Sequence, residues 1–137
     1  MAKETFWGIN SGTPLVQIAS RVLKAEILAQ EGQLTAGIAL LKQAVIQEDQ
    51  LNYNEPPDWF FSVRHQLGSL LLRARQWQEA ERVYTEDLKT FPDNGWALSG
   101  LAKAQQAQNK LAMAKQTQAR TRQAWQWADK RLVQTMQ

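Results

Sequence analysis

The chain has 137 residues, 44% of them hydrophobic, and no cysteine, which predicts one globular domain and excludes disulfides and cysteine zinc sites. His65 is the single histidine, so we expect neither a histidine metal cluster nor a His-dependent catalytic triad. No stretch approaches the roughly 20 apolar residues of a membrane-spanning helix, and the N-terminus lacks the apolar core of a signal peptide. We therefore expect a cytoplasmic protein with no membrane partner.

The net charge of +3 conceals an asymmetry along the chain. From Gly95 onward seven basic residues accompany one acidic residue, a net charge of +6, so the preceding part carries −3. A basic C-terminal part attracts acidic proteins or nucleic acid, although a solvated helix face explains the same pattern. Nucleic acid is the weaker expectation of the two.

The N-terminal region predicts an arm followed by a helical hairpin. Residues 1–13 show no hydrophobic period, and we expect Phe6 and Trp7 to dock on the first helices or on a neighbouring molecule. Thr13-Pro14 is typical of a helix start. The helix that follows ends near Gln30, before Gly32, and a second helix runs from Leu34 to about Gln50.

A second hairpin is predicted after a linker at residues 51–57, in which Pro56-Pro57 excludes a regular helix. Apolar residues recur at three- and four-residue steps on both sides of Arg75-Gln76, from about Trp59 to the residue before Pro92. Gly68 and Ala80 place one small residue on the buried face of each helix. We expect these two residues to let the helix backbones approach closely.

The rest of the chain predicts a third hairpin. One helix begins near Trp96, and the last helix runs from about Leu111 to Val133. The apolar stripe of the last helix comprises Ala114, Thr121, Trp125, Ala128 and Leu132. The sequence therefore predicts an all-α domain at 14–134, made of antiparallel pairs at about 14–50, 58–91 and 95–134.

The three pairs show internal repetition. Gly68 and Ala102 are 34 residues apart, as are Ala80 and Ala114, whereas Ala25 precedes Gly68 by 43 residues. The longer spacing equals the shorter one plus nine, and the proline-containing linker accounts for a nine-residue insertion. We therefore expect three copies of one helix-pair unit.

The middle unit, Leu67-Gly68…Leu71…Ala80…Tyr84…Pro92, resembles a tetratricopeptide repeat. It has arginine at position 64, where the family has a tryptophan, and Asp87 where a small residue is usual. The stretch from Ile18 to Asp129 further resembles the C-terminal part of larger bacterial tetratricopeptide proteins. The resemblance implies a short right-handed superhelix that binds peptides or proteins as a scaffold.

In such a superhelix the first helix of each pair lines the concave surface. The residues of these helices that lie off the buried stripe are Val22, Glu26, Ala29, Ser62, His65, Ser69, Arg73, Trp96, Ser99 and Lys103. The predicted partner-binding groove consists of these residues without Val22 and Ala29. Its cationic and aromatic members suit an acidic or C-terminal peptide carboxylate, whereas plain surface, or packing in the case of Trp96, is the alternative.

Chaperone-binding members of the family hold a carboxylate with lysines and asparagines in this groove. The matching places here carry His65, Gln66, Ser69, Trp96 and Gly100. The clamp is therefore absent, and chaperone tails are not an expected ligand.

Acidic residues around the linker allow an enzymatic or a cation-binding interpretation. Glu48, Asp49, Tyr53, Glu55 and Asp58 lie near Arg64 and His65 in the sequence, but at no spacing typical of a catalytic or calcium site. We expect these residues instead to cap helices and to form ion pairs with Arg64.

Taken with the absence of phosphate-loop, nucleophile-elbow and zinc motifs, these features predict a protein-interaction scaffold without enzymatic activity or cofactor. The alternative is self-association through the N-terminal arm or through the last helix, which carries Trp125 and Trp127.

Overall fold

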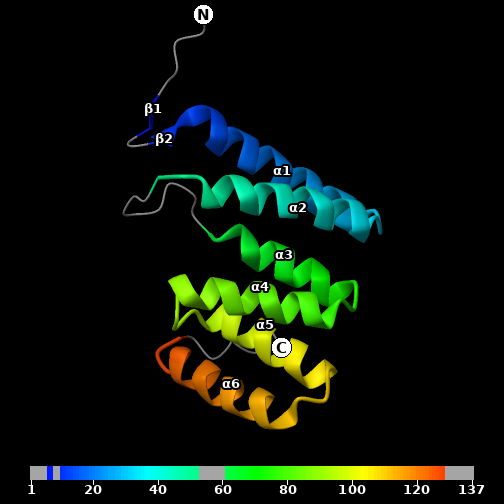
Figure 1. Cartoon of the computed structure of the whole chain (residues 1–137), viewed down its shortest axis with the longest axis vertical. Coiled ribbons are helices and arrows are strands. Elements are labelled where there is room, and N and C mark those ends of the chain that lie inside the picture. The colour runs from blue at the N-terminus through cyan, green and yellow to red at the C-terminus, as the bar shows by residue number, and fades with distance from the viewer. Residues whose placement is uncertain (1–5, 8–9, 53–60, 129–137) are drawn as a thin grey trace, which may run out of the picture.

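The computed structural model describes residues 6–7, 10–52 and 61–128, which form six helices and one short pair of strands (Figure 1). The helices are α1 (Gly12–Gln30), α2 (Leu34–Asp49), α3 (Val63–Arg73), α4 (Trp77–Thr90), α5 (Gly95–Ala107) and α6 (Leu111–Ala124). Strands β1 (Phe6–Trp7) and β2 (Asn10–Ser11) pair antiparallel before α1. None of the described helices is long and apolar enough to cross a membrane.

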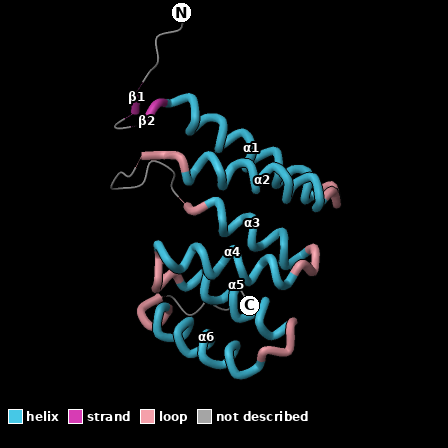
Figure 2. The backbone as a smooth tube through the Cα atoms, viewed as in Figure 1, coloured by secondary structure: helices cyan, strands magenta, loops and turns pink. Residues whose placement is uncertain are grey.

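The helices form three antiparallel pairs stacked in chain order. The turns within pairs lie on one side of the stack, and the C-terminal ends of α2 and α4 lie on the opposite side (Figure 2). Helix α3 contacts both α1 and α5, whereas no comparable contact joins α2 to α4 or α4 to α6 in the described part of the chain. The first helices of the pairs therefore lie on the inner side of a curved stack.

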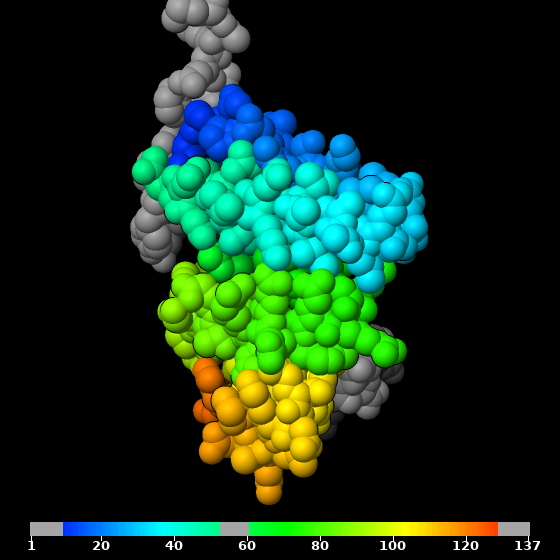
Figure 3. Space-filling view, turned by 45° about the vertical axis from the view of Figure 1, so that its right-hand side comes forward, coloured from blue at the N-terminus to red at the C-terminus, as the bar shows by residue number. Residues whose placement is uncertain are grey.

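The space-filling view shows the pairs as successive bands of colour, so each pair is covered mainly by its neighbours in the sequence (Figure 3). Each pair buries one face against the next, which is how repeat proteins build a continuous core. The largest fully buried side chains are Ile18, Leu41, Val63, Leu70, Leu71 and Leu98.

The turns within the pairs confirm the repeat spacing. Gly32, Arg75 and Asn109 have positive φ angles of 81°, 57° and 59°, and they lie 43 and 34 residues apart in the sequence. In each turn the next residue donates its N–H to a carbonyl five residues earlier, as Gln33 does to Leu28 and Gln76 does to Leu71. This is the Schellman ending of a helix.

The small residues of the stack act differently from the prediction. A Cβ atom on Gly37 would lie 2.9 Å from the Ala25 carbonyl oxygen, so the backbones of the first pair do approach closely. A Cβ on Gly68 would instead lie under 3.0 Å from ring atoms of Tyr84, and one on Gly100 would do the same. Gly68 therefore makes room for an aromatic ring, and Gly100 on α5 receives the same ring.

The end of the N-terminal arm is tied to the first pair. The side chain of Asn10, only 5% exposed, donates to the Asn52 carbonyl at 3.0 Å and accepts from the Asn52 N–H at 2.8 Å. These two bonds join β2 to the segment after α2. The structure describes the backbone of Phe6 and Trp7 as β1 but not the surroundings of their side chains, so their docking stays a prediction.

Two helix boundaries differ from the prediction. Helix α3 begins at Val63, capped by Ser62, and Trp59 lies outside the described residues. Helix α6 ends at Ala124, and residues 125–128 form a turn, so the predicted helix to Val133 is wrong. The indole of Trp125 lies against Gly95 at the start of α5, which fixes the place where the chain leaves the helix.

The buried stripe of α6 also differs from the prediction. Ala114 is buried as expected, whereas Thr121 and Trp125 are half-buried, and Leu132 lies outside the described residues. Buried Thr117 was not predicted, and it donates a hydrogen bond to the Gln105 side chain at 2.9 Å. The third pair thus closes with a hydrogen bond between buried polar groups, which satisfies both.

Packing of Tyr84 against Gly68 predicts a strong coupling between the two positions. Gly68→Ala should lower the free energy of unfolding by about 1–3 kcal/mol, because the added methyl group overpacks the ring. In a Tyr84→Leu background the same change should cost at least about 1 kcal/mol less. Urea unfolding of the four variants measures this coupling.

The control for this cycle is Ser69→Ala, a change at an exposed residue next to Gly68 on the same helix. It should alter stability by less than about 0.5 kcal/mol. Equal costs of Gly68→Ala in both backgrounds would contradict the packing.

Candidate functional site

A hollow of about 280 Å³ opens on the inner side of the stack, between α3, α5 and the end of α6. Its lining residues are His65, Ser69, Leu72, Tyr84, Trp96, Ser99, Gly100, Lys103, Thr121 and Trp125. The site therefore combines side chains from both inner helices of the second and third pairs with side chains from α4 and α6.

Tyr84 joins these elements. Its ring lies against Gly68 of α3 and Gly100 of α5, and the residue is 5% exposed. Burial raises the pKa of the Tyr84 hydroxyl, and the nearby Asp87 carboxylate raises it further. The hydroxyl therefore stays protonated at physiological pH, where it can donate or accept a hydrogen bond.

Two indoles form the most apolar wall. Trp96 and Trp125 meet edge to face, with ring centroids 5.3 Å apart and an interplanar angle of 82°. Gly95 provides the seat for Trp125, because a Cβ atom there would overlap the indole. Trp96 remains 44% exposed, and a large aromatic surface left open beside a hollow is typical of a binding site.

His65 brings polar chemistry to the wall formed by α3. Its Nε2 atom lies 2.9 Å from Oδ2 of Asp87, whose side chain is only 1% exposed. A buried carboxylate needs a partner to offset its desolvation, and Oδ1 of Asp87 has no hydrogen-bond partner. The His65 contact therefore partners one oxygen of the buried Asp87 carboxylate and joins α3 to α4.

Asn94 connects this pair to α5. Its side-chain oxygen caps α5 by accepting from the N–H groups of Trp96 and Ala97, at 3.0 and 3.4 Å. Capping fixes the amide orientation, so its nitrogen lies 2.8 Å from the same Nε2 atom of His65. Nε2 accepts from Asn94 when it is unprotonated and donates to Asp87 when it carries a proton. The imidazole is thus positioned from two other helices.

The structure brings some of the predicted groove residues together. His65, Ser69, Trp96, Ser99 and Lys103 all line the hollow.

The other three lie elsewhere. Ser62 caps α3 by accepting from the Arg64 N–H at 3.3 Å. Arg73 donates to the Ala29 carbonyl in the last turn of α1 at 3.0 Å, where a cation offsets the helix dipole. Glu26 is half-buried on α1, as is Val22, while Ala29 is only 1% exposed.

Five lining residues were not predicted: Leu72, Tyr84, Gly100, Thr121 and Trp125. The helical periodicity places Tyr84 and Trp125 on the buried faces of their helices. Periodicity alone does not indicate that part of each ring also lines a hollow. Gly100 stood at a place that matches the chaperone clamp, and this was the available signal.

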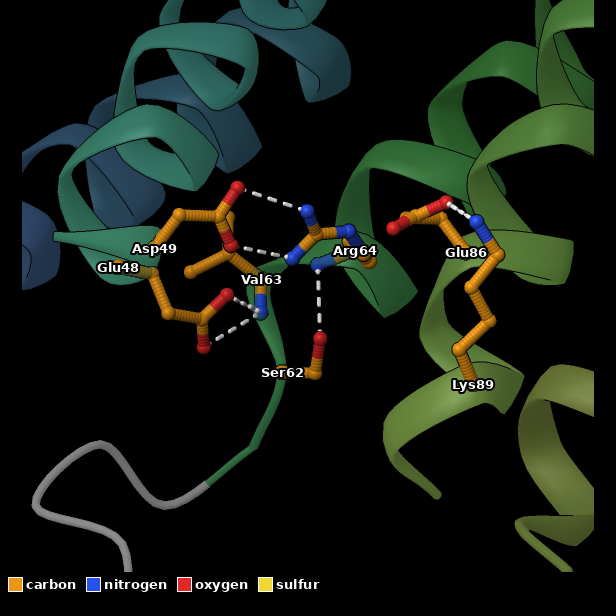
Figure 4. Close-up of polar contacts among 7 residues, drawn as sticks. All are labelled: Glu48, Asp49, Ser62, Val63, Arg64, Glu86 and Lys89. Carbon is orange, nitrogen blue, oxygen red and sulfur yellow. Dashed lines mark hydrogen bonds and ion pairs between the residues drawn. The ribbon is translucent and has the colours of Figure 1, made fainter. Parts of the chain in front are cut away.

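The two acidic residues at the end of α2 cap and pair with α3 (Figure 4). Asp49 accepts two hydrogen bonds from the Arg64 guanidinium, at 2.7 and 2.8 Å. Both oxygens of Glu48 accept from the Val63 N–H, at 3.1 and 3.0 Å. Figure 4 also shows the separate pair of Glu86 and Lys89 on α4, at 2.6 Å.

Neither acid at the end of α2 pairs with His65, as an enzymatic interpretation requires, because Glu48 bonds to Val63 and Asp49 to Arg64. The remaining acids of that interpretation, Glu55 and Asp58, lie outside the described residues, as does Tyr53. Within the described ranges no group of three or more histidines or acids could hold a metal ion.

Glu48 is electrostatically unusual. Burial raises the pKa of its carboxyl group to about 7, and this outweighs the Val63 hydrogen bond and the Arg64 charge, which both lower the pKa. The charges of Asp49 and Asp87 raise it further. The junction between the first and second pairs therefore contains a group that titrates near neutral pH.

Comparison with known proteins identifies the fold. No protein-family model matches the chain, and no curated protein matches it significantly in sequence. Among solved structures it is similar to the second TPR domain of the human RPAP3 protein, determined in complex with the HSP70 peptide SGPTIEEVD. The TM-score is 0.70 at 17% identity, over 90% of this chain and 94% of that one.

The chain therefore has the tetratricopeptide-repeat fold, as its middle unit indicated, and the predicted all-α stack of antiparallel helix pairs is confirmed. The two-residue strand pair before α1 was not predicted.

The raised pKa of Glu48 predicts that stability depends on pH. The folded chain retains a proton at Glu48 up to about pH 7, whereas an ordinary glutamate releases it near 4.5. The stabilisation is therefore complete below about pH 4.5 and is lost as pH rises through 7. The expected loss in unfolding free energy is roughly 1–3 kcal/mol.

Urea unfolding between pH 4.5 and 8 measures this loss in the wild type and in Glu48→Gln, which should lack it. Glu86→Gln, which removes a carboxylate from the exposed face of α4, serves as the control and should retain it. An identical pH dependence in Glu48→Gln and the wild type would show that another group is responsible.

Proposed function

We propose that this chain is a non-enzymatic scaffold that binds a peptide or protein segment in the hollow between α3, α5 and Trp125. The observation that carries the proposal is the exposed indole of Trp96, which lies beside cationic and hydroxyl groups on the inner side of the stack. Interfaces are typically centred on an aromatic residue in such a setting. The similar RPAP3 domain binds a peptide, which supports peptide binding here.

The charges around the hollow favour an acidic segment. Lys103 and His65 line it, and helix α6 carries Lys115, Arg120 and Arg122 without an acidic residue. Complementary charge speeds association and selects among partners. We propose that the protein is cytoplasmic and that it has a protein or peptide partner and no cofactor.

We propose a mode of binding that differs from that of a chaperone-tail receptor. The places where those receptors hold a terminal carboxylate carry His65, Gln66, Ser69, Trp96 and Gly100 here. His65 is paired with Asp87, and Gly100 lies against Tyr84. A ligand therefore meets aromatic rings where a clamp would present lysines and asparagines.

Substitutions in the hollow test the proposal. Affinity capture from a lysate of the source organism should recover proteins on the wild type that Trp96→Ala and Lys103→Glu no longer retain. For a purified partner we expect each variant to weaken the Kd at least about tenfold, as at interface hot spots.

The matched controls are Trp127→Ala and Lys24→Glu, which change exposed residues of the same types outside the hollow. They should bind as the wild type does. Thermal unfolding verifies that all four variants are folded, and undiminished binding by both hollow variants would refute the site.

Self-association is the second candidate, favoured by Trp127, which is 91% exposed directly after α6. If Trp127 joins two copies, light scattering should show a mass that rises with concentration, and Trp127→Ala should abolish the rise. A constant monomer mass up to high concentration would exclude it. Trp125 is less suited to this role because it packs on Trp96 and Gly95 within the chain.

A further inference from the structure

The size and wall chemistry of the hollow go beyond a general protein-binding groove. Resting on the proposed function, we propose that the hollow is a socket for one large apolar side chain of the partner, preferably aromatic, flanked in the partner by a carboxylate. The similarity of folds does not supply this specificity, which depends on side chains of α3, α4, α5 and α6 in this chain.

The volume of the hollow limits the occupant. At about 280 Å³ it lies just below the roughly 300–1,000 Å³ of sites that enclose a small molecule or cofactor. One large side chain fills such a space, whereas several consecutive residues do not. Partner segments commonly bind through a single anchoring side chain in a pocket of this kind.

The walls determine the chemistry of the anchor. Leu72, Tyr84, Trp96 and Trp125 contribute apolar surface from four different helices or helix ends. Trp96 and Trp125 already meet edge to face, and a third ring can extend this arrangement, because aromatic rings favour edge-to-face and offset contacts. A charged or small polar anchor would forfeit these contacts and leave the exposed Trp96 surface uncovered.

The polar lining determines what flanks the anchor. Lys103 of α5 supplies a cation to the lining. This charge suits a carboxylate next to the anchor in the partner. The hydroxyls of Ser69 and Ser99 can hydrogen-bond the partner backbone as donors or acceptors. The Thr121 hydroxyl donates to the Thr117 carbonyl and can accept from the partner.

A library of randomised octapeptides displayed on phage tests this proposal directly. The wild type should enrich peptides that contain Trp, Phe, Tyr or another large apolar residue next to Asp or Glu. In the best enriched peptide, replacing the large apolar residue with alanine should weaken binding at least tenfold. Replacing the neighbouring acid with its amide should also weaken binding, and should do so less at high salt.

Filling the hollow is the complementary test. Ser99→Leu places a larger side chain in the lining and should weaken binding of the best peptide at least tenfold, and Ser69→Leu provides a second filling variant from α3. Ser20→Leu is the matched control, because it makes the same change at an exposed position of α1 that does not line the hollow. It should bind as the wild type does. Thermal unfolding shows which variants are folded.

The outcomes separate the socket from the proposed function. Two results would overturn the socket and retain the proposed partner-binding groove, provided that Trp96→Ala still weakens binding of the enriched peptides. In the first, these peptides tolerate alanine at every apolar position. In the second, they bind unchanged to a folded filling variant. A wild type that enriches no peptide sequence would overturn both. Enrichment of basic peptides would overturn the charge preference on which the flanking carboxylate rests.

Discussion

The architecture of the inner surface depends on one packing interaction, the insertion of the Tyr84 ring between two glycines. Gly68 on α3 and Gly100 on α5 each leave space that a Cβ atom would fill, and the ring of α4 occupies it. One side chain therefore sets the distance between the two inner helices of the second and third pairs. The same ring lines the hollow, so the packing that closes the stack also shapes the candidate site.

Around this ring the sequence departs from its repeat pattern in ways that the structure explains. Asp87 stands where a small residue is usual, and it is buried against His65. Asn94 caps α5 and approaches the same imidazole. A single polar contact set thus connects α3, α4 and the start of α5 at the edge of the hollow, and Trp125 from α6 closes the other wall.

Features that depend on residues close together in the sequence were predicted correctly. Predictions failed where contacts between distant residues determine the position of a side chain or the end of a helix. Gly32 and Arg75-Gln76 are local signals, and both mark turns in which the structure has a residue with positive φ. Arg73 has the helical phase of a groove residue, yet its long side chain reaches the carbonyl of Ala29 on another pair. Trp125 has the phase of a core residue, and only its seat on Gly95 reveals that α6 ends there.

The central claim is that partners bind where Trp96 and Trp125 meet, and the indole N–H signals of the six tryptophans report on it in one nitrogen–proton NMR titration. The most strongly enriched octapeptide, or a captured partner segment, is added to labelled wild-type protein. The signals of Trp96 and Trp125 should shift together and saturate, while those of Trp77 and Trp127 stay in place. Saturating shifts confined to Trp127, with Trp96 and Trp125 unchanged, would contradict the account.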